Sequence, residues 1–253
     1  MRPRGDVLLH PAGPTLLEYA TKGCPVDCGP KWSRERIEKA IAKGPSKSAR
    51  DPEAARCCRE EALQKVAEGH CRLVKWDDIK DNLPENLKIS PIAAIPHKSR
   101  KYRMILNLAY RIRILKERLK SVNESTNKLA PQHAMFELGN VIPRIIWAMA
   151  RAPDTGVPIL FSKIDLKDGY WRMVVDEDEA WNFAYVLPPE NDDDPIMLVI
   201  PNALQMGWSE SPPFFCAGTE TARDVADKFW QESQKYYKEE DLSTCNHIQM
   251  RGQ

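Results

Sequence analysis

The first 88 residues combine polar stretches with helix-type spacing. Asp51, Pro52 and Glu53 stand in the order of a helix cap, a first-turn proline and an acidic first turn, and Gly69 supplies a stop. This order predicts a helix that begins after Asp51 and ends near Gly69. The preceding residues 43–50 are rich in glycine, proline and serine, which indicates a linker. We therefore expect a helical, polar N-terminal extension over residues 1–88.

From Ile89 onwards the pattern changes to short apolar runs. Residues 91–95 and 102–106 suit β-strands, and the six residues between them are turn-forming and basic. The pattern predicts a β-hairpin with a positively charged tip, which could fold onto a triphosphate as cations do in phosphoryl transfer. Lysines that are simply solvated at the tip are the alternative interpretation.

A third apolar run, residues 159–164, ends at Asp165. The run predicts a largely buried strand, whose end lets the carboxylate of Asp165 emerge from the core. An aspartate at a strand end is commonly a turn or cap residue. Here Gly169 permits close backbone approach and the aromatic Tyr170 follows five residues after Asp165, which makes the segment a candidate site.

A last helix is expected after Gly207. Ser211 is a good N-cap and Pro212 suits the first turn of a helix. The pattern predicts a helix that begins at this cap. Its apolar side chains recur at helical spacing, at Phe215, Ala222, Val225, Ala226 and Phe229.

Composition sets broad limits on the class of protein. The chain has 253 residues, 42% of them hydrophobic, which is enough for one large domain or two small ones. The best apolar run, residues 141–150, is broken by Pro143 and Arg144 and is shorter than the roughly 18 residues of a membrane helix. We therefore expect no membrane association. The start of the chain does not resemble a secretory signal.

The seven cysteines are an odd number and are spread unevenly along the chain. This argues against a secreted disulfide framework and predicts a reducing, intracellular location. A zinc site is one interpretation of some of them, although their spacings match no standard zinc pattern. Small apolar packing residues are the simpler interpretation. The candidate zinc ligands are Cys24, Cys28, Cys57, Cys58, His70 and Cys71.

The net charge of +1 hides an internal asymmetry. Residues 90–160 contain 12 Lys or Arg and 4 Asp or Glu, whereas residues 161–195 contain 3 and 10. A basic segment beside an acidic one suits an enzyme that acts on polyphosphate through metal ions, because phosphates attract cations and cations attract carboxylates. The alternative interpretation is that the basic and the acidic segment are simply two charged surfaces exposed to solvent.

Four segments, in order along the chain, resemble the reverse transcriptases of long-terminal-repeat retrotransposons and retroviruses. Residues 161–170, with the sequence FSKIDLKDGY, are similar to the first catalytic motif of that family. Residues 90–108 are similar to its fingers hairpin and the strand that follows. Residues 182–186 resemble the palm strand beyond the first motif, and residues 204–215 resemble the next motif.

The resemblance implies an α+β protein with a partial right-hand polymerase fold, which has fingers and an incomplete palm. The partial reverse-transcriptase domain would cover residues 89–253. Within it, residues 89–160 would be fingers-like, residues 161–230 would form the incomplete palm, and residues 231–253 would be a polar tail.

The resemblance also implies a catalytic carboxylate. Asp165 is expected to bind both magnesium ions of a two-metal site, with the carbonyl of Leu166 beside one of them. Two such ions activate the primer 3′-hydroxyl and stabilise the leaving pyrophosphate.

The same resemblance implies how a nucleotide would be held. Lys98 and Arg103 would meet the phosphates, with Lys101 as the alternative to Lys98. The backbone N–H groups of Asp168 and Gly169 would face the triphosphate. The remaining expected contacts are Tyr170 beneath the sugar, as a gate against a 2′-hydroxyl, and Met206 with Gly207 near the incoming nucleotide.

One part of that family's site is missing from this sequence. Reverse transcriptases carry an aromatic-x-Asp-Asp hairpin after the Ser-Pro helix, and no such run follows Trp230. The pair Asp77-Asp78 precedes the first motif, and residues 192–194 lie in an evident loop before Gly207. A single carboxylate is not expected to hold two metal ions. The prediction is therefore a truncated RNA-directed DNA polymerase that is inactive alone.

The expected partners are an RNA or DNA template–primer, deoxynucleoside triphosphates, and a further chain that supplies the missing palm and thumb. Two alternatives stay open. The chain could be a non-catalytic nucleic-acid-binding module that keeps the basic fingers, or it could be an inert relic.

Overall fold

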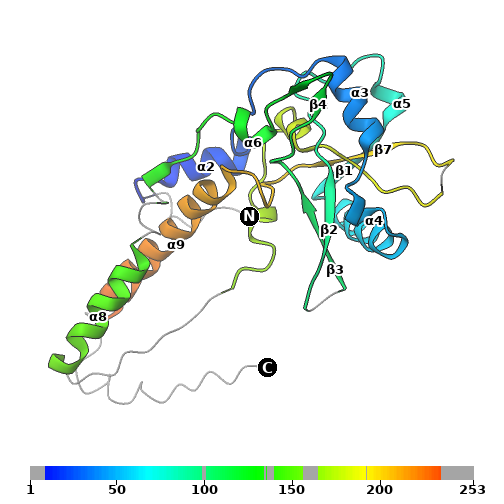
Figure 1. Ribbon diagram of the computed structural model, residues 1–253. Coiled ribbons are helices and arrows are strands. Elements are labelled where there is room, and N and C mark those ends of the chain that lie inside the picture. The colour runs from blue at the N-terminus through cyan, green and yellow to red at the C-terminus, as the bar shows by residue number, and fades with distance from the viewer. Residues whose placement is uncertain are drawn as a thin grey trace.

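The structure is a computed structural model that describes residues 9–98, 101–133, 135, 140–155, 165–191 and 193–234. Within these residues helices alternate with antiparallel strand pairs, which confirms the expected α+β class (Figure 1). The strand expected over residues 159–164 lies outside the described residues, as does most of the polar tail.

Helices account for more of the described residues than strands do. The α-helices are α2 (Gly13–Lys22), α3 (Arg34–Lys43), α4 (Pro52–Ala67), α5 (Trp76–Ile79), α6 (Val122–Ser125), α8 (Val141–Thr155) and α9 (Ser211–Gln234). Three short 3-10 helices join them, η1 (Lys47–Ala49), η2 (Gly169–Arg172) and η3 (Glu179–Phe183).

A three-stranded antiparallel sheet brings together segments that are distant in the sequence. Its order is β1 (Cys71–Lys75), β7 (Met197–Pro201) and β6 (Tyr185–Val186), with Cys71 opposite Pro201 and Tyr185 opposite Val199. The segment expected to be a helical extension, residues 1–88, therefore also contributes a strand, β1. These five residues find their strand partner only after more than a hundred further residues, so local spacing could not reveal it.

The expected hairpin is confirmed as β2 (Ile92–Pro96) paired with β3 (Tyr102–Leu106), with Ile92 opposite Leu106. The segment expected to be a linker packs along this hairpin. Ser46 donates its backbone N–H to the carbonyl of Ile92 at 2.8 Å, and the hydroxyl of Ser48 accepts from the N–H of Ala94 at 3.2 Å. These contacts fix the entry into α4. A second hairpin consists of β4 (Arg113–Ile114) and β5 (Glu117–Arg118).

Both predicted helix starts can be compared with the structure. The side chain of Asp51 accepts from the N–H groups of Glu53 and Ala54, so it caps α4 as predicted, and Gly69 follows the helix with φ 76°. Ser211 behaves differently. It is the first residue of α9, and its hydroxyl donates to the carbonyl of Gln205 at 2.8 Å, so it does not act as the N-cap.

One hydrophobic core connects the early and late parts of the chain. It extends from Tyr19 on α2 to Phe214 on α9, and it includes both Leu87 and Ile89, which flank the domain boundary expected after residue 88. The N-terminal segment therefore shares its core with the later residues. We call the described residues from 9 to 133 and from 165 to 221 the body; they include the sheet, the two hairpins, helices α2 to α6, the 3-10 helices and the first turns of α9.

Two helices extend away from the sheet of the body (Figure 1). They are α8 and the later part of α9, residues 222–234, and we call them the arm. Large apolar side chains on α8 are more than half exposed, at Ile142, Ile146, Trp147 and Met149. None of the helices in the described ranges combines the length and the apolar character that crossing a membrane requires.

Candidate functional site

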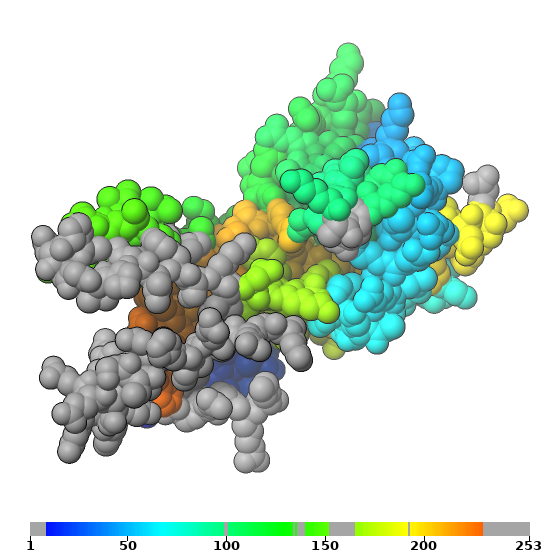
Figure 2. All heavy atoms as spheres, turned by 90° about the horizontal axis from the view of Figure 1, so that it is seen from below, coloured from blue at the N-terminus to red at the C-terminus, as the bar shows by residue number. Residues whose placement is uncertain are grey.

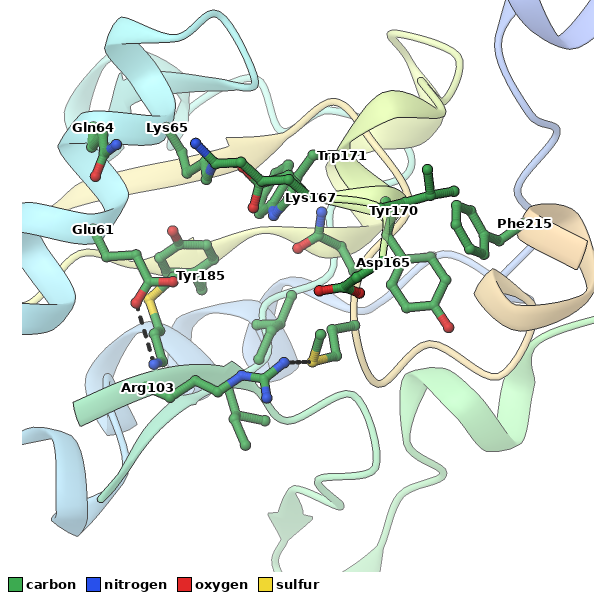
Figure 3. Close-up of a pocket in the computed structure, with 18 of the residues that line it drawn as sticks. Glu61, Gln64, Lys65, Arg103, Asp165, Lys167, Tyr170, Trp171, Tyr185 and Phe215 are labelled. Carbon is green, nitrogen blue, oxygen red and sulfur yellow. Dashed lines mark hydrogen bonds and ion pairs between the residues drawn. The ribbon is translucent and has the colours of Figure 1, made fainter. Parts of the chain in front are cut away.

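A pocket of about 680 Å³ lies where α4, β3, η2 and the start of α9 meet. In Figure 2 the yellow-green segment that begins at residue 165 lies beside the cyan of α4, and Figure 3 shows the side chains that face the space between them. Seven of the nine expected site residues line this pocket. They are Arg103, Asp165, Leu166, Asp168, Gly169, Tyr170 and Met206.

The other two expected residues, Lys98 and Gly207, do not line the pocket as it stands. Lys98 is exposed at the tip of the β2–β3 hairpin, directly before two residues that the structure does not describe. Gly207 has φ 99°, and its carbonyl accepts from the side-chain amide of Asn123 at 2.8 Å. Its role in the structure is thus to shape the turn before α9, because few side chains tolerate that backbone conformation.

Asp165 presents an exposed carboxylate to the pocket. In Figure 3 it points into the space between Tyr170 and Arg103. It forms no ion pair with any residue in the described ranges. A hard cation such as magnesium prefers oxygen ligands, so Asp165 fits as one ligand. No cluster of three or more His, Cys, Asp or Glu side chains among the described residues could complete such a site.

Asp168 is held by a lysine from the opposite wall. Lys65 of α4 places its Nζ 3.4 Å from Oδ2 of Asp168 and 2.7 Å from Oε2 of Glu68. Burial lowers the pKa of Lys65, but the hydrogen bond to Glu68 and the charge of Asp168 outweigh it, so that the pKa is raised. Lys65 is therefore charged at neutral pH, and Asp165 is the carboxylate of this loop that remains available.

Gly169 and Tyr170 are fitted against α9. A Cβ atom on Gly169 would lie 2.7 Å from the ring of Phe215, so a larger residue would require that ring to shift. The ring of Tyr170 meets that of Phe215 edge to face, with centroids 5.2 Å apart. Burial raises the pKa of the Tyr170 phenol, which keeps it neutral. The apolar side of the pocket is thus an aromatic pair supported by α9.

The cationic side of the pocket comes from β3. The guanidinium of Arg103 lies against the sulfur of Met206 and forms no ion pair with a described residue. A thioether is a weak acceptor, so the hydrogen-bonding capacity of Arg103 is largely unused. The neighbouring N–H of Met104 donates to the carboxylate of Glu61 on α4 at 3.4 Å, which ties β3 to that helix.

The sequence reasoning missed the α4 wall. Glu61, Gln64 and Lys65 line the pocket, and all three come from the segment expected to be a separate extension. Their spacing of three and four residues puts them on one helical face, and the sequence could have predicted that grouping. Nothing in that spacing, however, indicated that the face would lie against residues 165–170.

Four of the cysteines considered as zinc ligands are packing residues of the core. The six cysteines of the described part are all free, and Cys24, Cys28, Cys58 and Cys71 are buried in the core. Burial raises the pKa of the Cys24 and Cys71 thiols to about 12, and that of the Cys28 and Cys58 thiols to about 11. These thiols stay protonated and pack as small apolar groups.

No protein-family model matches this chain, and no curated protein matches it. The function of the pocket therefore has to be argued from its own chemistry and from the motifs of this sequence.

Proposed function

We propose that this chain carries the fingers and part of the palm of a reverse-transcriptase polymerase, and that its pocket takes a deoxynucleoside triphosphate. The observation that carries the proposal is the convergence of residues from all four motif segments on one pocket. Arg103, the residues from Asp165 to Tyr170, Tyr185 and Met206 together span about a hundred positions in the sequence and still share that space.

The composition of the pocket suits the parts of a nucleotide. Arg103 offers an unpaired planar cation, which is suited to bidentate contact with phosphate. The ring of Tyr170, which meets Phe215 edge to face, offers an apolar face of the kind that a sugar or base covers. Asp165 offers a carboxylate for a cation that accompanies the triphosphate.

We further propose that these 253 residues do not polymerise alone. Magnesium, when bound, would supply charge stabilisation at the reacting phosphate. Asp165 would be one of its ligands, while Asp168 is already engaged by Lys65. The sequence after Trp230 holds no aromatic-x-Asp-Asp run, so the second acidic motif would have to come from elsewhere.

Calorimetric titration of the full chain with a deoxynucleoside triphosphate and Mg²⁺ tests the binding proposal. We expect binding that Arg103→Met and Asp165→Asn each weaken at least tenfold, about 1.4 kcal/mol. Arg113→Met and Asp193→Asn make the same chemical changes at exposed positions outside the pocket, and they should bind as the wild type does. Equal affinity in all five proteins would refute the pocket assignment.

Primer extension on an RNA template with Mg²⁺ tests the claim of inactivity. We expect no synthesis by the isolated chain. Robust synthesis that Asp165→Asn abolishes would show that the chain is a complete polymerase, and the inactivity claim would be wrong.

A second candidate function, nucleic-acid binding without catalysis, is favoured by the β4–β5 hairpin. Arg113, Lys116 and Arg118 are exposed there and form no ion pair with any residue that the structure describes, and Leu115 at the tip is 89% exposed. Unpaired cations on a projecting hairpin suit a phosphate backbone.

Fluorescence anisotropy with a single-stranded oligonucleotide, in EDTA and over a range of salt concentrations, tests this second function. Changing the three hairpin cations to Ala should reduce the slope of log affinity against log salt by about 2. Changing the exposed lysines Lys31, Lys39 and Lys75 instead removes the same charge and should leave the slope nearly unchanged. Equal slopes in both triple variants would count against the hairpin as the contact.

A further inference from the structure

Lys65 occupies an unusual position for a lysine. Its side chain is only 10% exposed, at the C-terminal end of α4. Its ammonium group lies between the carboxylates of Glu68 and Asp168, and it lies 5.5 Å from the centre of the Trp171 ring. A lysine with so little exposure needs close counter-charges to offset its lost hydration, and these two carboxylates supply them.

The two carboxylates differ in what they connect. Glu68 is three residues from Lys65, next to the end of the same helix, so that contact is local. Asp168 is 103 residues away, in the loop that carries Asp165 and leads into η2. The contact with Asp168 therefore joins α4 to the loop on the other side of the pocket, where Figure 3 draws Lys65 and Asp165 facing the same space.

The backbone at Asp168 requires outside support. It has φ 55° and ψ 40°, the left-handed conformation, which costs a residue with a side chain roughly 1 kcal/mol. Aspartate is among the residues that tolerate this conformation best. It still persists only where neighbouring contacts hold it, and the ion pair to Lys65 is the contact made by the side chain of Asp168.

We infer that Lys65 is a positioning residue for the proposed nucleotide site: it fixes the loop from Asp165 to Gly169 against α4 and neutralises Asp168, which leaves Asp165 as the loop's cation ligand. The inference rests on the proposed function for its last part only. The fixing of the loop is a property of the free protein, so the two parts can be tested separately.

The first measurement is amide hydrogen exchange of the full chain without ligand. In Lys65→Met, the amides of residues 166–170 should exchange at least tenfold faster, while those of β3 and β7 keep their wild-type rates. Lys65→Arg retains the cation and should restore most of the protection. Lys39→Met removes an exposed lysine on α3 and serves as the matched control.

Two results would overturn the inference. One is unchanged exchange of residues 166–170 in Lys65→Met. The other is faster exchange spread evenly over β3, β7 and the loop, because that marks a general loss of stability. If Lys65→Met does not fold, Asp168→Asn removes the same ion pair from its more exposed side and should give the same local effect.

The second measurement is the affinity for Mg²⁺ with a deoxynucleoside triphosphate. Lys65→Met should weaken it about tenfold, and the double variant with Asp168→Asn should be little weaker than either single variant, since both remove one contact. If the wild type binds no nucleotide, the proposed function is wrong, and the exchange data still decide the role of Lys65. If the wild type binds and Lys65→Met binds equally well, the positioning role is refuted.

Discussion

The body and the arm of this protein use large apolar side chains in opposite ways. In the body, Trp208 is 2% exposed, its ring lies 5.2 Å from that of Phe183, and its indole N–H donates to the hydroxyl of Thr126. On the arm, Trp147 is 62% exposed and has the guanidinium of Arg151 above its ring. The same residue type is thus a core anchor in one region and a surface group in the other.

This difference shows where the candidate site gets its rigidity. Every residue that lines the pocket belongs to the body, and α9 contributes Phe215 and Thr219 from its buried first turns. The arm supplies no pocket residue in the described ranges. Changes in the body should therefore alter stability and the pocket together, whereas changes on the arm should leave both nearly unaffected.

The largest expected effect comes from a matched pair of tryptophans. Trp208→Ala removes a buried ring and a hydrogen bond and should lower the free energy of unfolding by about 3–5 kcal/mol. Trp147→Ala removes an exposed ring and should cost less than about 1 kcal/mol. Urea denaturation measures both values. Similar losses in the two variants would mean that the division into body and arm has no energetic basis.

Two glycines of the body, one in the pocket and one on α9 close to the arm, should respond to alanine with opposite changes in stability. Gly169→Ala places a methyl group against the Phe215 ring and should cost about 1–3 kcal/mol. Gly218 lies inside α9 with no atom within 4 Å of an added Cβ, so Gly218→Ala should stabilise the helix by about 0.5–1 kcal/mol. Thermal unfolding of the two variants gives the sign directly. A gain in both would show that Phe215 moves aside easily.

The effect that is smallest at neutral pH, and that grows only at alkaline pH, concerns the buried thiols. In the unfolded chain the thiols ionise near their ordinary pKa of 9, whereas the native protein holds the Cys24 and Cys71 protons up to about 12. The stability that depends on these protons is complete below pH 9 and is lost as the pH rises from 9 towards 12. Each thiol should cost about 1.4 kcal/mol per pH unit in that window.

Urea denaturation at several pH values between 8 and 10.5 measures this slope, and Cys24→Ala should make it shallower by one thiol. The five buried thiols of the described residues all lie in the body, so this loss of stability should come from the body and not from the arm. A slope that Cys24→Ala leaves unchanged would contradict the assignment.

The features that the sequence predicted well are local ones. The cap at Asp51, the stop at Gly69 and the β2–β3 hairpin each depend on residues that are close together in the sequence, so a local pattern is enough to predict them. The grouping of Arg103 with Asp165, Tyr170 and Met206 came from motif resemblance, and the pocket brings these residues together.

The features that were missed depend on distant partners. β1 carries only five residues of strand pattern, and its pairing with β7 decides its conformation. Ser211 matches the capping rule, yet it is already the first helical residue of α9, and its hydroxyl donates to the carbonyl of Gln205. In the sequence Lys65 is one of many cations in a polar helix, and only the structure shows that its Nζ lies 3.4 Å from the carboxylate of Asp168. In each case tertiary contact overrode a local preference.

The sheet order also governs when this protein can fold. β7 is the middle strand, so β1 and β6 both have to wait for residues 197–201 before either gains its partner. During synthesis β1 therefore leaves the ribosome long before its partner strand β7 does. Pairing at such a separation is slow, because a long loop must close before the first contact forms. The pocket, which is lined in part by Tyr185 of β6, is therefore expected to form only after β7 has been synthesised.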